Sequence, residues 1–99
     1  METARVSLNA DELWLLHAML ASGEASPSHV GMLLDPKTLP AGSPPWERVC
    51  AAVDRLSARG LIQAKPVHTF GIGTGAPTQF TGTKFTDKGL LSVAALESP

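Results

Sequence analysis

The chain has 99 residues, of which 43% are hydrophobic and 17% are charged, with eight lysines and arginines against nine aspartates and glutamates. This length fits one domain and excludes a catalytic domain beside a separate binding domain. The net charge of −1 excludes the strongly basic class of nucleic-acid binders, although it is compatible with a local basic face.

The first predicted element is a helix that begins at Ala10 and ends at Gly23. Asn9 followed by Glu12 forms an N-x-x-E variant of the capping box, and Gly23 suits the left-handed end position. Apolar residues occupy most of the circumference of this helix, which predicts a central place in the core. Residues 1–7 carry no pattern and are predicted to form an N-terminal arm, which leaves residues 8–99 as a single domain.

A second, short helix is predicted from Ser26 as its cap and Pro27 as its first residue to Asp35. It would end there because Pro36 disfavours helical geometry in the residue before it. Residues 36–45 hold four prolines and a glycine. We therefore expect a stiff, irregular connection in this segment and no flexible linker.

A third helix is predicted over residues 44–59, with Ser43 as its cap, Pro44 as its first residue and Gly60 closing it. Helical spacing places Trp46, Val49, Val53 and Leu56 on one apolar side, with Cys50 on its flank as a small buried residue. Trp46 is expected to anchor the start of the helix, in the core or against the proline-rich connection before it. Three arginines, Arg48, Arg55 and Arg59, fall within about 40° of one another on another side. The outward arc holds Glu47, Ala51, Asp54 and Ala58, so the exposed face is mixed in charge.

The pattern then changes to strands. Residues 61–70 and 79–85 are predicted to form two antiparallel strands, joined by the glycine-rich stretch GIGTGAPT. Thr86 can cap a last helix over residues 87–96. The predicted fold class is therefore α+β, with three helices, a two-stranded hairpin and a C-terminal helix.

Three passages carry a resemblance to a known family: VDRL at Val53–Leu56, RGLI at Arg59–Ile62 and FTDKGL at Phe85–Leu90. With them the chain resembles a winged helix-turn-helix domain of the MarR and PadR type of transcriptional regulators, in bacteria or their phages. The resemblance implies that helix 44–59 reads the major groove of double-stranded DNA and that the hairpin, the wing, touches the adjacent backbone. The matching positions are Ser43, Glu47, Arg48, Ala51 and Arg55 on the helix, and Lys65, His68 and Lys84 around the wing.

A second function stays open, because winged-helix folds also serve as protein-interaction adaptors without DNA binding. A mixed arginine face is often a solvated helix surface with internal ion pairs. A protein partner or a homodimer is possible under either function. The two functions differ in chemistry, since DNA binding weakens steeply with salt and protein binding depends on apolar anchors.

Other classes are disfavoured by the residues present. The single cysteine excludes an internal disulfide framework, and His17, His29 and His68 fall in three different elements without the spacing of metal ligands. We therefore expect no metal, no cofactor and no enzyme activity. No run approaches the roughly 20 apolar residues of a membrane span, and no signal pattern is present, so a cytoplasmic protein without membrane contact is predicted.

Overall fold

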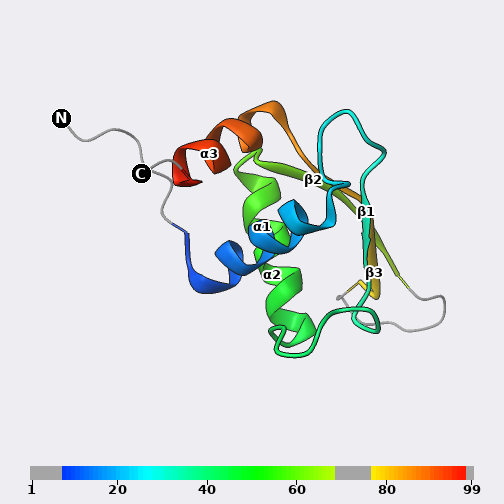
Figure 1. The fold of residues 1–99 in the computed structure, drawn as a ribbon. Helices are drawn as coiled ribbons and strands as arrows, with labels where there is room; N and C mark the ends of the chain where they lie inside the picture. The colour runs from blue at the N-terminus through cyan, green and yellow to red at the C-terminus, as the bar shows by residue number, and fades with distance from the viewer. Residues whose placement is uncertain (1–7, 69–76, 98–99) are drawn as a thin grey trace.

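The computed structural model describes residues 8–68 and 77–97. In chain order its elements are helix α1 (Ala10–Ser22), strand β1 (Met32–Leu34), helix α2 (Trp46–Ala58), strands β2 (Ile62–Val67) and β3 (Gln79–Phe85), and helix α3 (Asp87–Glu97). The three helices lie to one side of the sheet, and α1 crosses α2 (Figure 1). The fold is α+β, with three helices and a three-stranded antiparallel sheet among the described residues.

Apolar side chains from both layers form the core. The buried ones include Leu15, Leu16 and Met19 of α1, Leu34 of β1, Val49, Val53 and Leu56 of α2, Ile62 of β2, and Phe80 and Phe85 of β3. The predicted apolar face of α2 is thus confirmed, and Cys50 on its flank is buried. Full burial of a leucine or phenylalanine side chain contributes about 1.5–3 kcal/mol. These contacts therefore fix the orientation of α2 between α1 and the sheet.

Helix α1 begins and ends where the sequence predicts. The Asn9 side chain accepts a hydrogen bond from the Glu12 amide at 2.8 Å, and the Glu12 carboxylate accepts one from the Asn9 amide at 2.9 Å. This reciprocal pair is the predicted capping box. At the other end Gly23 adopts the left-handed conformation with φ 73°.

The predicted helix at residues 27–35 is wrong. The Ser26 hydroxyl accepts a hydrogen bond from the Ser28 amide, which closes a turn, and the following Gly31 has φ 105°, a value outside the helical region. A Cβ on Gly31 would lie 2.4 Å from the carbonyl carbon of Gly82, so the two backbones touch at this point. Strand β1 follows, with Leu33 exposed and Leu34 buried. This alternation of period two belongs to a strand.

Helix α2 begins two residues later than predicted. Ser43 does not cap it; its hydroxyl donates to the Pro40 carbonyl oxygen at 2.6 Å. Pro45 is the N-cap residue, with extended backbone, because proline keeps the preceding Pro44 out of the helical region. The predicted closure at Gly60 is confirmed. The Gly60 and Leu61 amides donate to the carbonyls of Ser57 and Leu56, an arrangement that satisfies the last turn.

The predicted hairpin has a third strand beside it. β2 and β3 pair antiparallel as expected, but β1 pairs with the other edge of β3, which gives the sheet order β1-β3-β2. The partners of Met32 and Leu34 are Thr83 and Phe80, which are three residues apart, so β3 bulges around Gly82. Three predicted parts lie outside the described residues: the arm at residues 1–7, the last two residues of the predicted strand 61–70, and residues 71–76 of the GIGTGAPT stretch.

The RGLI passage, which holds Gly60, and the FTDKGL passage, which holds Gly89, meet at the start of α3. The Thr86 hydroxyl accepts a hydrogen bond from the Gly89 amide at 2.9 Å, which confirms Thr86 as the cap, and donates to the Gly60 carbonyl at 2.6 Å. A Cβ on Gly89 would lie 1.8 Å from the Leu61 carbonyl oxygen. A glycine is therefore required for α3 to pack against the end of α2.

Candidate nucleic-acid interface

Arg48 of α2 is held by the first turn of α1. Its Nε donates to Asp11 Oδ2 at 2.9 Å and its Nη2 donates to Asp11 Oδ1 at 2.7 Å. This bidentate pair fixes the guanidinium plane. The Arg48 side chain is nevertheless 59% exposed, whereas the Asp11 side chain is 15% exposed. The arginine thus stays accessible although its orientation is set by α1.

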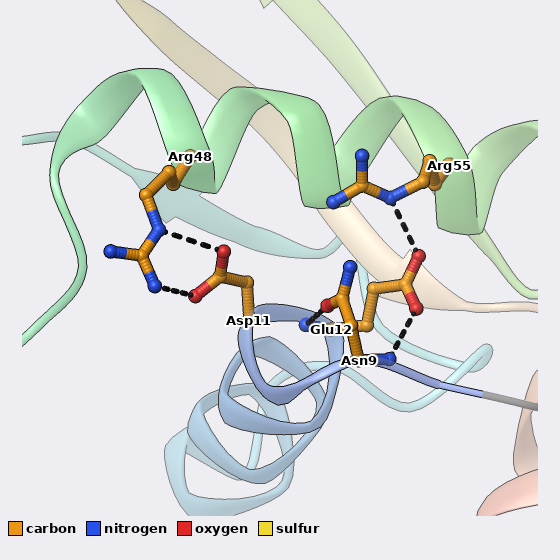
Figure 2. A network of polar contacts seen from close by, with 5 residues as sticks. All are labelled: Asn9, Asp11, Glu12, Arg48 and Arg55. Atoms are coloured by element: carbon orange, nitrogen blue, oxygen red, sulfur yellow. Dashed lines mark hydrogen bonds and ion pairs between the residues drawn. The ribbon is translucent and has the colours of Figure 1, made fainter.

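Arg55, almost two turns further along α2, contacts the neighbouring carboxylate. Its Nε donates to Glu12 Oε2 at 2.9 Å, while Glu12 Oε1 accepts the capping hydrogen bond from the Asn9 amide. The Glu12 side chain is almost completely buried, and Arg55 remains 45% exposed. Figure 2 shows this network of five residues between the two helices. One buried carboxylate therefore both caps α1 and ties it to α2.

The electrostatics of the Asp11 pair keep both partners charged. The hydrogen bonds from Arg48 hold the pKa of the Asp11 carboxyl below its ordinary value, and those to Asp11 raise the pKa of Arg48. Both groups are ionised at neutral pH. The arginine side of α2 was predicted to face DNA, and the structure shows that its first two members are also ion-pair partners of α1.

The start of α2 touches the end of the hairpin. Trp46 Nε1 donates to the Pro77 carbonyl oxygen at 2.8 Å, and the Trp46 ring lies 5.8 Å from that of Phe80, centroid to centroid. Trp46 packs against the core, so its predicted role as an anchor of the helix start is confirmed. The contact brings the first turn of α2, which carries Arg48, to the same end of the molecule as the hairpin.

The sheet separates two of the predicted wing contacts, Lys65 and Lys84, from the arginines of α2. Ile62 and Phe85 pair across the hairpin and face the core, so the next pair, Gln63 and Lys84, faces the opposite side of the sheet. Lys65, two residues beyond Gln63, shares that outer face. The remaining predicted residues are placed as follows: Ser43 before α2, exposed Glu47 and half-buried Ala51 on α2, and exposed His68 just after β2.

Lys84 is engaged with the turn before β1. Its Nζ donates to the carbonyl oxygen of His29 at 3.0 Å and lies 3.4 Å from that of Pro27. This lysine therefore holds the turn that replaces the predicted second helix.

The sequence alone did not assign Asn9, Asp11 and Glu12 to this candidate surface, where Asp11 and Glu12 pair with the arginines of α2 and Asn9 bonds to Glu12. The capping box could be found, because it lies within four residues. The ion pairs could not, since they join residues 37 and 43 positions apart.

A small apolar hollow lies on another part of the surface. Met19, Leu20, Ala25, Phe85 and Leu90 are among the residues that line its volume of about 140 Å³. Small-molecule sites usually have volumes of roughly 300–1,000 Å³. This hollow is therefore too small for a typical ligand of that kind.

Among residues 8–68 and 77–97, no three histidine, cysteine or acidic side chains gather in a way that could hold a metal ion. Burial raises the pKa of the Cys50 thiol, with Asp54 adding to the effect. None of the helices in the described part of the chain is long and apolar enough to span a membrane.

Comparisons with protein-family models, with curated proteins and with solved structures each found no match.

Proposed function

We propose that this chain is a small winged-helix protein that binds duplex DNA, with α2 in the major groove and the β2–β3 hairpin against the adjacent backbone. The observation that carries the proposal is the hydrogen bond from Trp46 to Pro77, which keeps the start of α2 beside the end of the hairpin. A duplex that meets Arg48 at this end also comes close to the hairpin. Both contacts are needed for a helix and a wing to bind one site.

The order of the elements supports the same proposal. A helix followed by a glycine-closed turn, a hairpin and a further capped helix matches the resemblance on which the prediction was based. In this arrangement β1 extends the wing sheet, and the turn at residues 26–29 together with β1 takes the place of the second helix predicted over residues 27–35.

The local charge balance predicts modest affinity for DNA of arbitrary sequence. Arg48 and Arg55 on α2 and Arg59 at its C-terminal cap are accompanied by four carboxylates, which are those of Asp11, Glu12, Glu47 and Asp54. Attraction to phosphates in general is therefore weak, because nearby carboxylates offset the arginine charges. Specific contacts by individual arginines must supply much of the binding energy.

The test is an anisotropy titration of a pool of labelled duplexes, about two helical turns long, at about 50 mM and about 200 mM salt. We expect binding at the lower salt, with log Kd rising by about 2 to 4 per unit of log salt concentration. The double variant Arg48→Ala with Arg55→Ala should bind at least about tenfold more weakly. The control Lys88→Ala removes one positive charge from α3 near the other end of α2, where Lys88 donates to the Arg59 carbonyl, and should have little effect on binding.

Folding of each variant is checked by circular dichroism, because both arginines also tie α1 to α2. A charge-preserving pair, Arg48→Lys with Arg55→Lys, separates loss of charge from loss of bidentate geometry. No binding at low salt, or equal weakening by the arginine and Lys88 variants, would contradict the proposal.

In that case the alternative is a protein-interaction adaptor without DNA binding. The observation that favours it is the exposure of large apolar side chains, with Leu91 of α3 74% exposed and Leu33 of β1 49% exposed. Burial of these leucines against a partner would remove apolar surface from water and favour binding.

A further inference from the structure

The guanidinium of an arginine has two edges that can each make a pair of parallel hydrogen bonds. One edge is formed by Nε and one Nη atom, and the other by the two Nη atoms. In Arg48 the first edge is occupied, because Nε and Nη2 both donate to Asp11. Within the described residues, Nη1 makes no hydrogen bond, and in Figure 2 it points away from α1. The outer edge, Nη1 with the second hydrogen of Nη2, remains available.

We propose that Arg48 reads a guanine base with this outer edge and that Asp11 is the residue that positions it. The inference rests on the proposed DNA-binding function and adds a base preference to it. Guanine presents two acceptors side by side in the major groove, O6 and N7, which match two parallel N–H donors. Adenine presents an acceptor beside a donor and does not match them.

Asp11 explains why Arg48 would distinguish guanine from other bases better than a flexible arginine would. A long side chain loses rotamer freedom when it is immobilised at an interface. The bidentate pair with Asp11 already holds Arg48 in one orientation, so less freedom is lost on binding. Asp11 is itself only 15% exposed and is fixed by the first turn of α1.

Asp11 also acts on DNA of any sequence, with the opposite sign. Its carboxylate repels phosphates near the same surface and reduces attraction to an arbitrary duplex. The residue therefore weakens non-specific binding and strengthens the contact with guanine. A residue that served only to stabilise the fold would change both kinds of binding in the same direction.

Glu12 is less suitable as a probe of this effect. Its carboxylate is buried and also closes the capping box of α1, so its replacement would disturb the helix start. Asp11→Asn keeps the shape of the side chain and removes its charge. Asp87→Asn is the matched control, because Asp87 is an exposed aspartate in the first turn of α3.

The experiment begins with selection of tight-binding duplexes from a random-sequence library by the full chain. The selected duplex is then compared with a random duplex, and with a copy that carries 7-deazaguanine, which lacks the N7 acceptor, at each selected guanine in turn. Binding is measured for the unmodified protein and for the variants Asp11→Asn, Arg48→Ala and Asp87→Asn. Urea unfolding confirms that each variant is folded under the binding conditions.

Loss of N7 at one guanine should weaken binding of the unmodified protein about fivefold and leave binding of Arg48→Ala unchanged. Asp11→Asn should bind the random duplex about two- to threefold more tightly, while its preference for the selected duplex falls about tenfold. Asp87→Asn should change neither quantity by more than about twofold.

Two results would overturn the inference while the DNA-binding function stands. One is an equal cost of 7-deazaguanine for the unmodified protein and Arg48→Ala, and the other is an unchanged sequence preference in Asp11→Asn. Failure of the unmodified protein to bind any duplex at low salt is a different result, because it would overturn the proposed function together with this inference.

Discussion

Thr83 shows how a single residue can work against the stability of this fold. Its side chain is fully buried on the central strand β3, and among the described residues its hydroxyl has no hydrogen-bond partner. An unpaired buried hydroxyl costs about 1–3 kcal/mol relative to a satisfied one. A methyl group in the same position would have no such cost.

Thr83→Val should therefore raise the free energy of unfolding by about 1 kcal/mol, measured by urea denaturation. Thr81→Val, on the same strand at a half-buried position, is the control and should change stability by less than about 0.5 kcal/mol. A loss of stability in Thr83→Val would show that the hydroxyl is satisfied in solution.

At the same scale, the sequence indicates which side of α2 carries the arginines but not which residues they contact. The helical period correctly placed Arg48 and Arg55 on one side of α2, and the apolar spacing correctly placed Trp46 in the core. Neither pattern contains information on which residue of α1 lies opposite, since that depends on how the two helices cross. The proposed role of Asp11 could therefore only come from the structure.

Among the elements, those defined by local interactions could be predicted and the one defined by a distant partner could not. α1 and α3 have caps made within three residues of the helix start, and β2 and β3 are joined by one hairpin. β1 pairs with a strand about 50 positions further along. Ser26 and Pro27 form a typical helix-start sequence, and no neighbouring residue indicates a strand instead.

The junction between α2 and α3 yields a prediction at this scale. Replacing glycine by alanine inside a helix normally stabilises it by about 1 kcal/mol. Gly89→Ala should instead destabilise the protein by about 2–4 kcal/mol, because its Cβ would clash with the Leu61 carbonyl oxygen. Chemical denaturation measures the effect. Ser92→Ala, one turn later in α3, should be neutral or slightly stabilising, and a stable Gly89→Ala would mean that α3 can shift away from α2.

For the whole molecule, the carboxylates of Asp11 and Asp35 make the free energy of unfolding depend on pH. The Asp35 carboxylate accepts hydrogen bonds from the Lys37 amide and the Gln79 side chain, which lower its pKa, as Arg48 lowers that of Asp11. A lowered pKa means that the folded protein binds fewer protons than the unfolded chain. The stabilisation is complete above the ordinary aspartate pKa and is lost as pH falls through the folded values.

The urea midpoint should therefore fall between about pH 5 and about pH 3, and it should fall less in the double variant Asp11→Asn with Asp35→Asn. Glu24→Gln, which replaces an exposed carboxylate in the turn after α1, is the control and should keep the full acid sensitivity. Equal acid sensitivity in the double variant would show that other carboxyl groups cause the loss.

The contact between Gly31 and Gly82 has a consequence for how the sheet can vary. A three-residue edge strand is normally able to slip along its neighbour, because few hydrogen bonds define its alignment. Here the bare backbones meet at one point, and any shift of β1 would press a side chain of one strand onto the main chain of the other. The alignment is thus fixed at Gly31, just before the first residue of β1. The register of β1 therefore does not depend on the proline-rich segment at residues 36–45, whose length can change without moving the sheet.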